Sequence, residues 1–348
     1  MAEIRTELRT EGIRTQEDAA PIHGREVRFA GPAGVLGGSL QLPPPGVDPL
    51  AVVVCLHGSG PQDRDENSPG APLQIFNAFA ADCAAAGLAS LRYDKRGVGE
   101  SGGDLLAADV HDLAADGLAA VRFARRLHET HGLPVFLLGH SEGATLAMLV
   151  AAMDPTLAGL VLLAPSLSPM ETLLRQQAAA VQQAIAALPA SQREEFGIPP
   201  GFDQRAATEE LIAAVRAAPP EHPVIEFMGQ PVPARWFQSH FALDLGALAG
   251  QVRCPVLVVG GSKDAQVPPR DAQALAARVR QAAEARGETP DVTAAFVPDL
   301  THILRRTDGP GDPSGYAALA ERPVDPDLRR LVQQWLAEHL PRPAAEPQ

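Results

Sequence analysis

The fold is decided by one stretch of the chain, Pro134-Val135-Phe136-Leu137-Leu138-Gly139-His140-Ser141-Glu142-Gly143-Ala144. Its apolar run stops at a glycine, a single serine follows, and a second glycine comes two residues later. An alanine-rich segment with helical spacing then continues from Ala144 to Met153. This is a G-x-S-x-G pattern between a strand and a helix, where a tight turn lifts the serine above the edge of a sheet. The pattern predicts that Ser141 is a nucleophile at a helix N-terminus, where the helix dipole favours developing negative charge.

The composition is that of a globular protein and restricts its partners. The 348 residues fit one large domain, or a domain with an insertion. The net charge of −13 argues against nucleic acid or an anionic membrane surface as a partner. No apolar run approaches the roughly 20 residues of a membrane-spanning helix, and residues 1–14 lack the apolar core of a signal peptide. We therefore expect a cytoplasmic protein, either a monomer or a homodimer.

The three cysteines give no sign of a metal site or a disulfide framework. Cys55 and Cys254 lie in or beside apolar, strand-like runs, and Cys83 completes an odd number without metal-ligand spacing. Buried thiols are the favoured interpretation. No other cluster with the spacing of metal ligands is visible, so we expect no metal and no cofactor.

Strand and helix patterns alternate along most of the chain, which is typical of a mostly parallel sheet with helices on its faces. A hairpin is expected from segments 26–30 and 38–42 around Gly31-Pro32-Ala33-Gly34. Apolar runs predict buried strands at 51–56, 88–93, 159–163, 255–260 and 292–297, besides the one before Ser141. Helical spacing is found at 73–86, 110–129, 144–153, 270–286 and 325–340.

The alternation stops between residues 166 and 250, where helical spacing at 170–188 and 208–217 is separated by proline-containing loops. This segment is interpreted as a mainly helical cap insertion. Because it follows the carboxyl end of a strand, it should cover the active-site edge of the sheet. The expected organisation is a loosely attached lead-in at 1–22, a core at 23–165 and 251–342, and the cap at 166–250.

A serine hydroxyl needs a base and an orienting acid to act as a nucleophile, and both are expected at the same sheet edge. Asp264 follows the strand at 255–260, and His302 follows the strand at 292–297. The order Ser141, Asp264, His302 is that of enzymes with a nucleophile elbow. His57 is a rival base, but we favour a role in ordering its own loop. His140 is expected to point away from Ser141.

The developing oxyanion requires two backbone N–H donors. One is expected from Glu142, directly after the nucleophile, and the other from Ser59 in His57-Gly58-Ser59-Gly60, the loop after the first buried strand. Gly58 and Gly60 would let the backbone approach the substrate closely. The carboxylate of Glu142 beside such a site has no explanation in the sequence.

Together these motifs resemble the α/β-hydrolase fold, in its branch of carboxylesterases and serine-aminopeptidase-like enzymes. The similarity rests on His57-Gly58-Ser59-Gly60-Pro61, Asp94-Lys95-Arg96-Gly97-Val98-Gly99-Glu100-Ser101, Gly139-His140-Ser141-Glu142-Gly143, Asp264 with Val267-Pro268, and His302. It spans roughly residues 25–340 and implies a central eight-stranded sheet with a cap after the sixth strand. It gives Asp94 and Arg96 no catalytic role, and we interpret them as a structural pair closing their loop.

Three further residues are candidates for the substrate pocket. Arg64 lies in the charged run Asp63-Arg64-Asp65-Glu66, which begins beside the proposed oxyanion donor, and is a candidate ligand for a substrate carboxylate. Trp236 and Phe237 stand out in an aromatic-poor insertion and are candidates for an acyl pocket. Packing of the cap against the core is the alternative for this aromatic pair.

The leading hypothesis is a serine hydrolase that cleaves small carboxylic esters through an acyl-enzyme. A peptidase, an amidase or an acyltransferase would use the same residues and is the alternative. A non-enzymatic binding protein of the same fold is the third possibility, although such proteins usually lose one of the three residues and none is missing here.

Overall fold

The computed structural model describes residues 24–340, so the predicted lead-in at 1–22 lies outside the described residues. An eight-stranded sheet has the order β1-β2-β4-β3-β5-β6-β9-β10. Strands β1 and β2 pair antiparallel, β2 pairs antiparallel with β4, and all later pairs are parallel. The strands are β1 (Arg25–Gly31), β2 (Gly34–Gln41), β3 (Val52–Leu56), β4 (Ala89–Tyr93), β5 (Val135–His140), β6 (Gly159–Leu163), β9 (Val256–Lys263) and β10 (Val292–Thr301).

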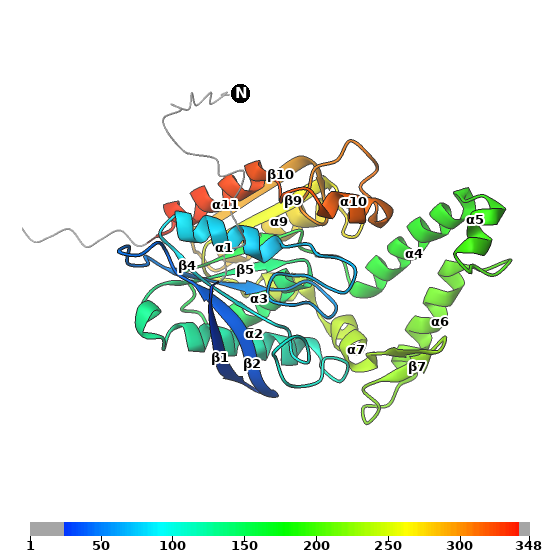
Figure 1. The fold of residues 1–348 in the computed structure, drawn as a ribbon, viewed down its shortest axis with the longest axis horizontal. Coiled ribbons are helices and arrows are strands. Elements are labelled where there is room, and N and C mark those ends of the chain that lie inside the picture. Colours follow the sequence, from blue (N-terminus) through cyan, green and yellow to red (C-terminus); the bar gives the residue numbers. More distant parts are fainter. Residues whose placement is uncertain (1–23, 341–348) are drawn as a thin grey trace, which may run out of the picture.

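Helices cover both faces of this sheet (Figure 1). One face packs against α2 (Val110–Ala124), α3 (Glu142–Met153), α8 (Leu245–Ala249) and α9 (Arg270–Ala285). The other packs against α1 (Ile75–Ala85), α10 (Tyr316–Ala320) and α11 (Pro326–Glu338). The sequence of β3 is continuously apolar because both of its faces are buried: Val52 and Val54 enter one layer of the core, and Val53 and Cys55 enter the other. The predicted fold class is confirmed.

The predicted elements differ from the observed ones mainly at their ends. Strands β9 and β10 extend to Lys263 and Thr301, three and four residues beyond the predicted ends. The predicted helix at 110–129 is too long, because α2 ends at Ala124 and a short 3₁₀ helix, η1, follows at His128–Thr130. The hydroxyl of Thr130 donates to the carbonyl of Ala124 and so satisfies a group that the helix end leaves free.

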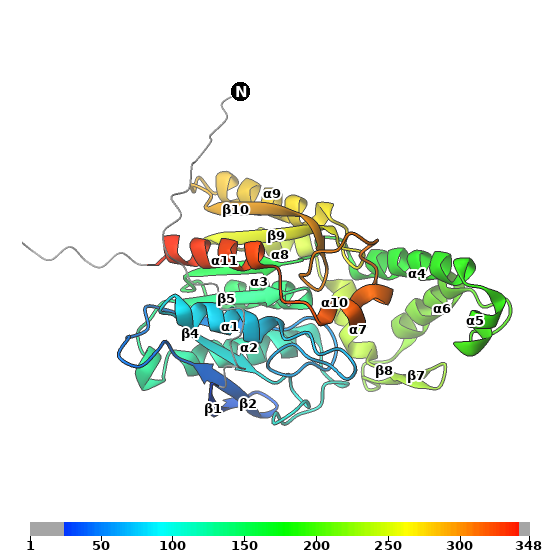
Figure 2. The same cartoon turned by 45° about the horizontal axis from the view of Figure 1, so that its top comes forward.

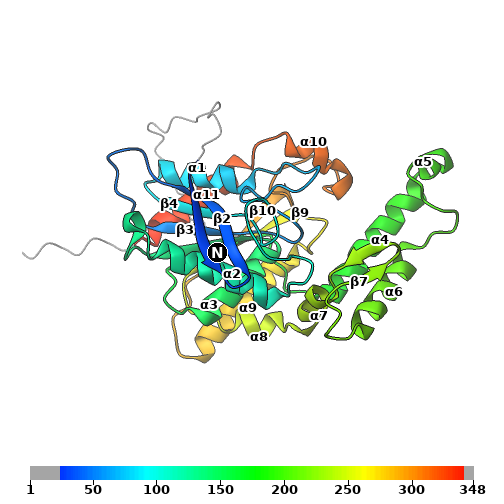
Figure 3. The same cartoon turned by 60° about the horizontal axis from the view of Figure 1, so that its bottom comes forward.

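The segment from Ser166 to Gly250, which we call the cap, separates β6 from β9. It contains α4 (Met170–Ala187), α5 (Ala190–Glu195), α6 (Gln204–Ala217), the hairpin β7 (Ile225–Phe227) with β8 (Gln230–Val232), α7 (Ala234–Ala242) and α8. Helices α4, α5 and α6 project beyond the carboxyl ends of the parallel strands, and α7 lies between them and the core (Figures 2 and 3). Helices α5, α7 and α8 and the hairpin are absent from the predicted elements.

Strand register brings the functional loops to one edge of the sheet. Leu56 at the end of β3 pairs with Gly139 near the end of β5, so the loop of Ser59 and the turn of Ser141 leave the sheet together. Thr301 pairs with Lys263 after a register shift in β10, so the next residues, His302 and Asp264, also leave it side by side. Between residues 24 and 340 we find no helix with the length and apolarity needed to cross a bilayer.

Candidate active site

The turn at Ser141 is held in a conformation that only its neighbouring glycines permit. Ser141 has φ 55° and ψ −118°, which is strained for a residue with a side chain. A Cβ on Gly143 would lie 1.9 Å from the carbonyl oxygen of Leu56, and one on Gly139 would lie 2.1 Å from that of Gly143. Helix α3 starts at Glu142, two residues before the predicted start, so Ser141 stands directly at its N-terminus.

The structure brings Ser141, His302 and Asp264 together. The hydroxyl oxygen of Ser141 lies 2.9 Å from His302 Nε2, and His302 Nδ1 lies 2.8 Å from Asp264 Oδ2. The other carboxylate oxygen of Asp264 accepts hydrogen bonds from the backbone N–H groups of Gln266 and Val267. Asp264 and His302 are buried, so water does not compete for the contact between them. The geometry is that of a nucleophile, a base and an orienting carboxylate.

Two backbone N–H groups remain available beside this serine. In the described part of the chain the N–H of Ser59 has no hydrogen-bond acceptor, and that of Glu142 begins a helix, where no intrahelical acceptor exists. The loop lies close, because a Cβ on Gly58 would be 3.4 Å from the Cβ of Ser141. Ser59 and Glu142 thus lie beside Ser141 with N–H groups that no acceptor in residues 24–340 occupies, and their role as oxyanion donors stays a prediction.

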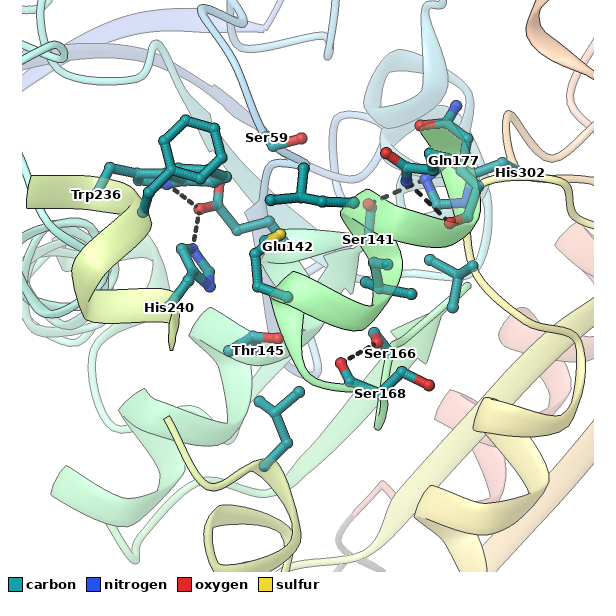
Figure 4. Close-up of a pocket in the computed structure, with 17 residues that line it drawn as sticks. Ser59, Ser141, Glu142, Thr145, Ser166, Ser168, Gln177, Trp236, His240 and His302 are labelled. Atoms are coloured by element: carbon teal, nitrogen blue, oxygen red, sulfur yellow. Dashed lines mark hydrogen bonds and ion pairs between the residues drawn. The ribbon is translucent and has the colours of Figure 1, made fainter. Parts of the chain in front are cut away.

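Ser141 lies between two cavities that also share Ser59, Gln266 and His302. The first, of about 210 Å³, lies beneath the cap and is shown in Figure 4. Trp236 and Phe237 line it, together with apolar side chains of α4. The second, of about 380 Å³, opens toward α10 and is lined by Ile303 and Tyr316 among others. A substrate with its reacting carbonyl at Ser141 has room on both sides.

The structure corrects the predictions for Arg64 and its neighbours. Arg64 lines neither cavity, because its guanidinium binds both carboxylate oxygens of Asp94 and also reaches Glu26. None of residues 63–66 lines either of these two cavities, since Asp63 folds the run back by accepting the backbone N–H groups of residues 65 and 67. The predicted structural pair of Asp94 and Arg96 does not form, because Nε of Arg96 instead donates to Oδ2 of Asp116 at 2.6 Å.

Among the described residues, the rings of His57 and His140 have other partners and form no hydrogen bond with the Ser141 hydroxyl. His57 is buried against the rings of Phe76 and Tyr93. Burial and the charge of Lys95 lower its pKa to about 4, so the ring is neutral and a weak base at neutral pH. His140 turns below the site, where Nδ1 lies 2.9 Å from Glu66 and Nε2 lies 2.8 Å from the carbonyl oxygen of His302.

The carboxylate of Glu142, unexplained in the sequence, is buried and fully engaged. Its Oε2 lies 2.8 Å from Lys95 Nζ, and its Oε1 lies 2.6 Å from Trp236 Nε1 and 2.9 Å from His240 Nε2. Burial opposes its ionisation, but the charge of Lys95 and the contact with His240 outweigh this and lower its pKa to about 2. Figure 4 shows Trp236 and His240 converging on this carboxylate.

Sequence reasoning missed Lys95, His240 and Glu66. Lys95 directly follows Asp94 at the end of β4, so the same strand-end argument that found Asp264 also applied to it. His240 lies four residues after Trp236, which places both on one face of a helix once α7 is recognised. Within residues 24–340, no group of three or more His, Cys, Asp or Glu side chains is arranged to hold a metal ion.

The comparisons with known proteins agree with this architecture. Residues 48–302 match the family described as serine aminopeptidase, S33. The chain is 26% identical over 295 residues to esterase EstD of Thermotoga maritima; the match covers 85% of this chain but 64% of that relative, less than two thirds of its length.

Two examples among the solved structures illustrate the similarity of fold. Est1E of Butyrivibrio proteoclasticus with bound ferulic acid has a TM-score of 0.57 at 17% identity, covering 90% of this chain and 98% of that one. The Pyrococcus furiosus esterase Pf2001 has a TM-score of 0.58 at 17% identity, covering 94% of this chain and 97% of that one. Because the family match extends over well more than half of the chain, this protein belongs to the serine aminopeptidase (S33) family of α/β hydrolases.

Proposed function

We propose that this protein is a serine hydrolase that cleaves small carboxylic esters through an acyl-enzyme. The observation that carries the proposal is the hydrogen-bonded series Ser141, His302 and Asp264 at the meeting point of two cavities. The similarity to an esterase of Thermotoga maritima supports the same reaction class.

In the proposed reaction, Nε2 of His302 accepts the proton of the Ser141 hydroxyl as the oxygen attacks the ester carbonyl. Asp264 holds the imidazole by Nδ1 and stabilises the positive charge that forms on the ring. The carbonyl oxygen becomes an anion that accepts hydrogen bonds from the N–H groups of Ser59 and Glu142. Each such donor typically contributes about 10²–10³ to the rate.

The alcohol then leaves with the proton held by His302, and the acyl group stays on Ser141. A water molecule that loses its proton to His302 attacks this acyl-enzyme and releases the carboxylic acid. The two cavities fit this sequence, because the acyl and alcohol halves of an ester can occupy opposite sides of Ser141. No cofactor enters any of these steps.

The lining of the cavities favours an ester over an aminopeptidase substrate. A peptide with a free amino terminus needs a carboxylate to bind its ammonium group. Among the described residues that line the two cavities, Glu142 is the one acidic side chain, and Lys95, Trp236 and His240 already occupy its oxygens. We therefore assign the ester bond, rather than the amide bond, as the substrate.

A substrate panel tests this proposal. Purified protein is assayed on p-nitrophenyl esters from acetate to laurate and on alanine and leucine p-nitroanilides, with Ser141→Ala as the control. We expect turnover of the esters, highest for the short acyl chains that the cavity under the cap accommodates, and no release of p-nitroaniline. Equal turnover of the anilides, or full ester activity in Ser141→Ala, would contradict the proposal. Adding an alcohol or amine acceptor and analysing the products separates hydrolysis from acyl transfer.

A further inference from the structure

The peptide unit that carries the Ser59 N–H is held from outside the substrate site. Its carbonyl, that of Gly58, accepts a hydrogen bond of 2.6 Å from Lys95 Nζ. The N–H of Gly58, in the preceding unit, donates to Glu66 at 2.7 Å. The carbonyl of Gly60 also lies 3.2 Å from Lys95 Nζ. Two carbonyl groups of residues 57–60, which we call the oxyanion loop, thus accept hydrogen bonds from one buried ammonium group.

The geometry of a trans peptide turns this contact into an orientation of the donor. The C=O and N–H of one planar trans unit point in opposite directions, and residues 24–340 contain no cis bond. A carbonyl fixed toward Lys95 therefore directs the Ser59 N–H away from Lys95. A positive charge on the carbonyl side also polarises the unit and strengthens its N–H as a donor.

The charge of Lys95 is balanced by Glu142, the residue that supplies the other proposed oxyanion N–H. Both side chains are 3% exposed, so removing one partner would leave the other charge buried and unpaired, which strongly destabilises a protein. The remaining oxygen of Glu142 binds Trp236 and His240 of α7 in the cap. One carboxylate thereby connects the turn of Ser141, the oxyanion loop and the cap.

We propose that Lys95 is a positioning residue that orients and polarises the Gly58–Ser59 peptide for oxyanion binding. In this proposal Glu142 couples the orientation of that peptide to the position of α7 on the core. The inference rests on the proposed function, because it concerns the transition state of acyl transfer at Ser141. It predicts a loss of oxyanion stabilisation that comes in addition to the loss of stability expected from removing a buried charge.

The test compares an ester with its thionoester, in which sulfur replaces the carbonyl oxygen. Sulfur accepts hydrogen bonds poorly, so an intact oxyanion hole favours the ester strongly. In Lys95→Met we expect kcat on the ester to fall about 10–10²-fold with KM nearly unchanged, and the ester-to-thionoester ratio of kcat/KM to fall by a similar factor.

Arg96→Met is the matched control, because Arg96 forms an equally buried ion pair with Asp116 and its other hydrogen bond goes to the carbonyl of Asp112, not to the oxyanion loop. It should lose stability and keep the wild-type ratio. An unchanged ratio in Lys95→Met, or an equal drop in Arg96→Met, overturns the proposal. If Lys95→Met does not fold, the double variant Lys95→Met/Glu142→Gln, which removes both buried charges, is measured instead. We expect its ester-to-thionoester ratio of kcat/KM to fall in the same way, and an unchanged ratio overturns the proposal.

Trp236→Phe tests the connection to the cap, because it removes the indole N–H and keeps an aromatic ring. We expect the ratio to fall about two- to fivefold, and a wild-type ratio would remove α7 from the proposal. Ser141→Ala separates the two levels of inference. If that variant retains ester activity, the proposed function fails; if it is inactive while the Lys95 variants keep the wild-type ratio, only the positioning role fails.

Discussion

The imidazole of His140 lies 2.9 Å from the carboxylate of Glu66, and both side chains are buried beneath the active site. The same ring contacts the carbonyl oxygen of His302, while Glu66 accepts the N–H of Gly58. The pair of His140 and Glu66 therefore holds both the loop of His302, the proposed base, and the loop of Ser59, a proposed oxyanion donor. Burial favours a neutral imidazole, but the charge and hydrogen bond of Glu66 outweigh it and raise the pKa of His140 above its usual 6.5.

A raised pKa makes this pair stabilise the protein most at low pH. The contribution of the pair to the free energy of unfolding is fully present below about pH 6.5, the pKa of His140 in the unfolded chain. It is lost as pH rises through the higher pKa of His140 in the folded protein. We expect the difference in free energy of unfolding between wild type and His140→Gln to be largest near pH 6 and to shrink toward pH 9. Urea unfolding across this range measures it. A difference that stays constant or grows with pH would contradict a charged His140.

Asp264→Asn tests the orienting carboxylate. The amide retains the shape of the side chain but favours the wrong tautomer of His302, so we expect kcat on p-nitrophenyl acetate to fall about 10³–10⁴-fold while KM changes little. Thermal unfolding of the variant serves as the folding control. A loss below tenfold would exclude this assignment of Asp264.

His57 provides a comparison for the base. The lowered pKa of His57, about 4, and the packing of its ring on Phe76 rather than a hydrogen bond to Ser141 predict that His57→Gln retains kcat within about tenfold of wild type, whereas His302→Gln loses about 10³-fold or more. Both variants are measured on p-nitrophenyl acetate at pH 7.5. Equal losses in the two would mean that the base is assigned incorrectly.

Gly143→Ala tests the steric origin of the turn. The added methyl group would overlap the carbonyl oxygen of Leu56, so we expect the free energy of unfolding to fall by more than about 3 kcal/mol, or the protein not to fold. Gly315→Ala is the control, because in the described chain no atom beyond its own and its adjacent residues lies within 4 Å of the point where its methyl group would stand, and its φ of −87° suits alanine. Superimposable unfolding curves for wild type and Gly143→Ala would refute the steric argument.

The sequence was sufficient to predict the fold and to predict which residues at the ends of strands come together. Ser141, Asp264 and His302 each come directly after an apolar strand, and parallel strands end at a common edge, so their meeting followed from order and pattern. The alternation of Val52 to Leu56 into two layers likewise follows from a run that is apolar on both sides.

The polar contacts around these three residues could not be predicted from order and pattern. Glu66 and His140 are separated by 74 positions, and no periodicity links them. The prediction for Arg64 is wrong because a charged loop residue can turn either toward the pocket or toward Asp94, and only the folded loop decides between them. The aromatic character of Trp236 predicts a pocket residue, but its bond to Glu142 depends on where α7 seats on the core.

The central claim is that Ser141 is the nucleophile of an acyl-enzyme, and covalent labelling tests it most directly. The protein is treated with a fluorophosphonate, which reacts with an activated serine, and the modified residue is identified by peptide mass spectrometry. We predict one adduct, located on Ser141, with labelling abolished in Ser141→Ala and strongly slowed in His302→Gln. An adduct on another residue, or undiminished labelling of Ser141→Ala, would contradict the account.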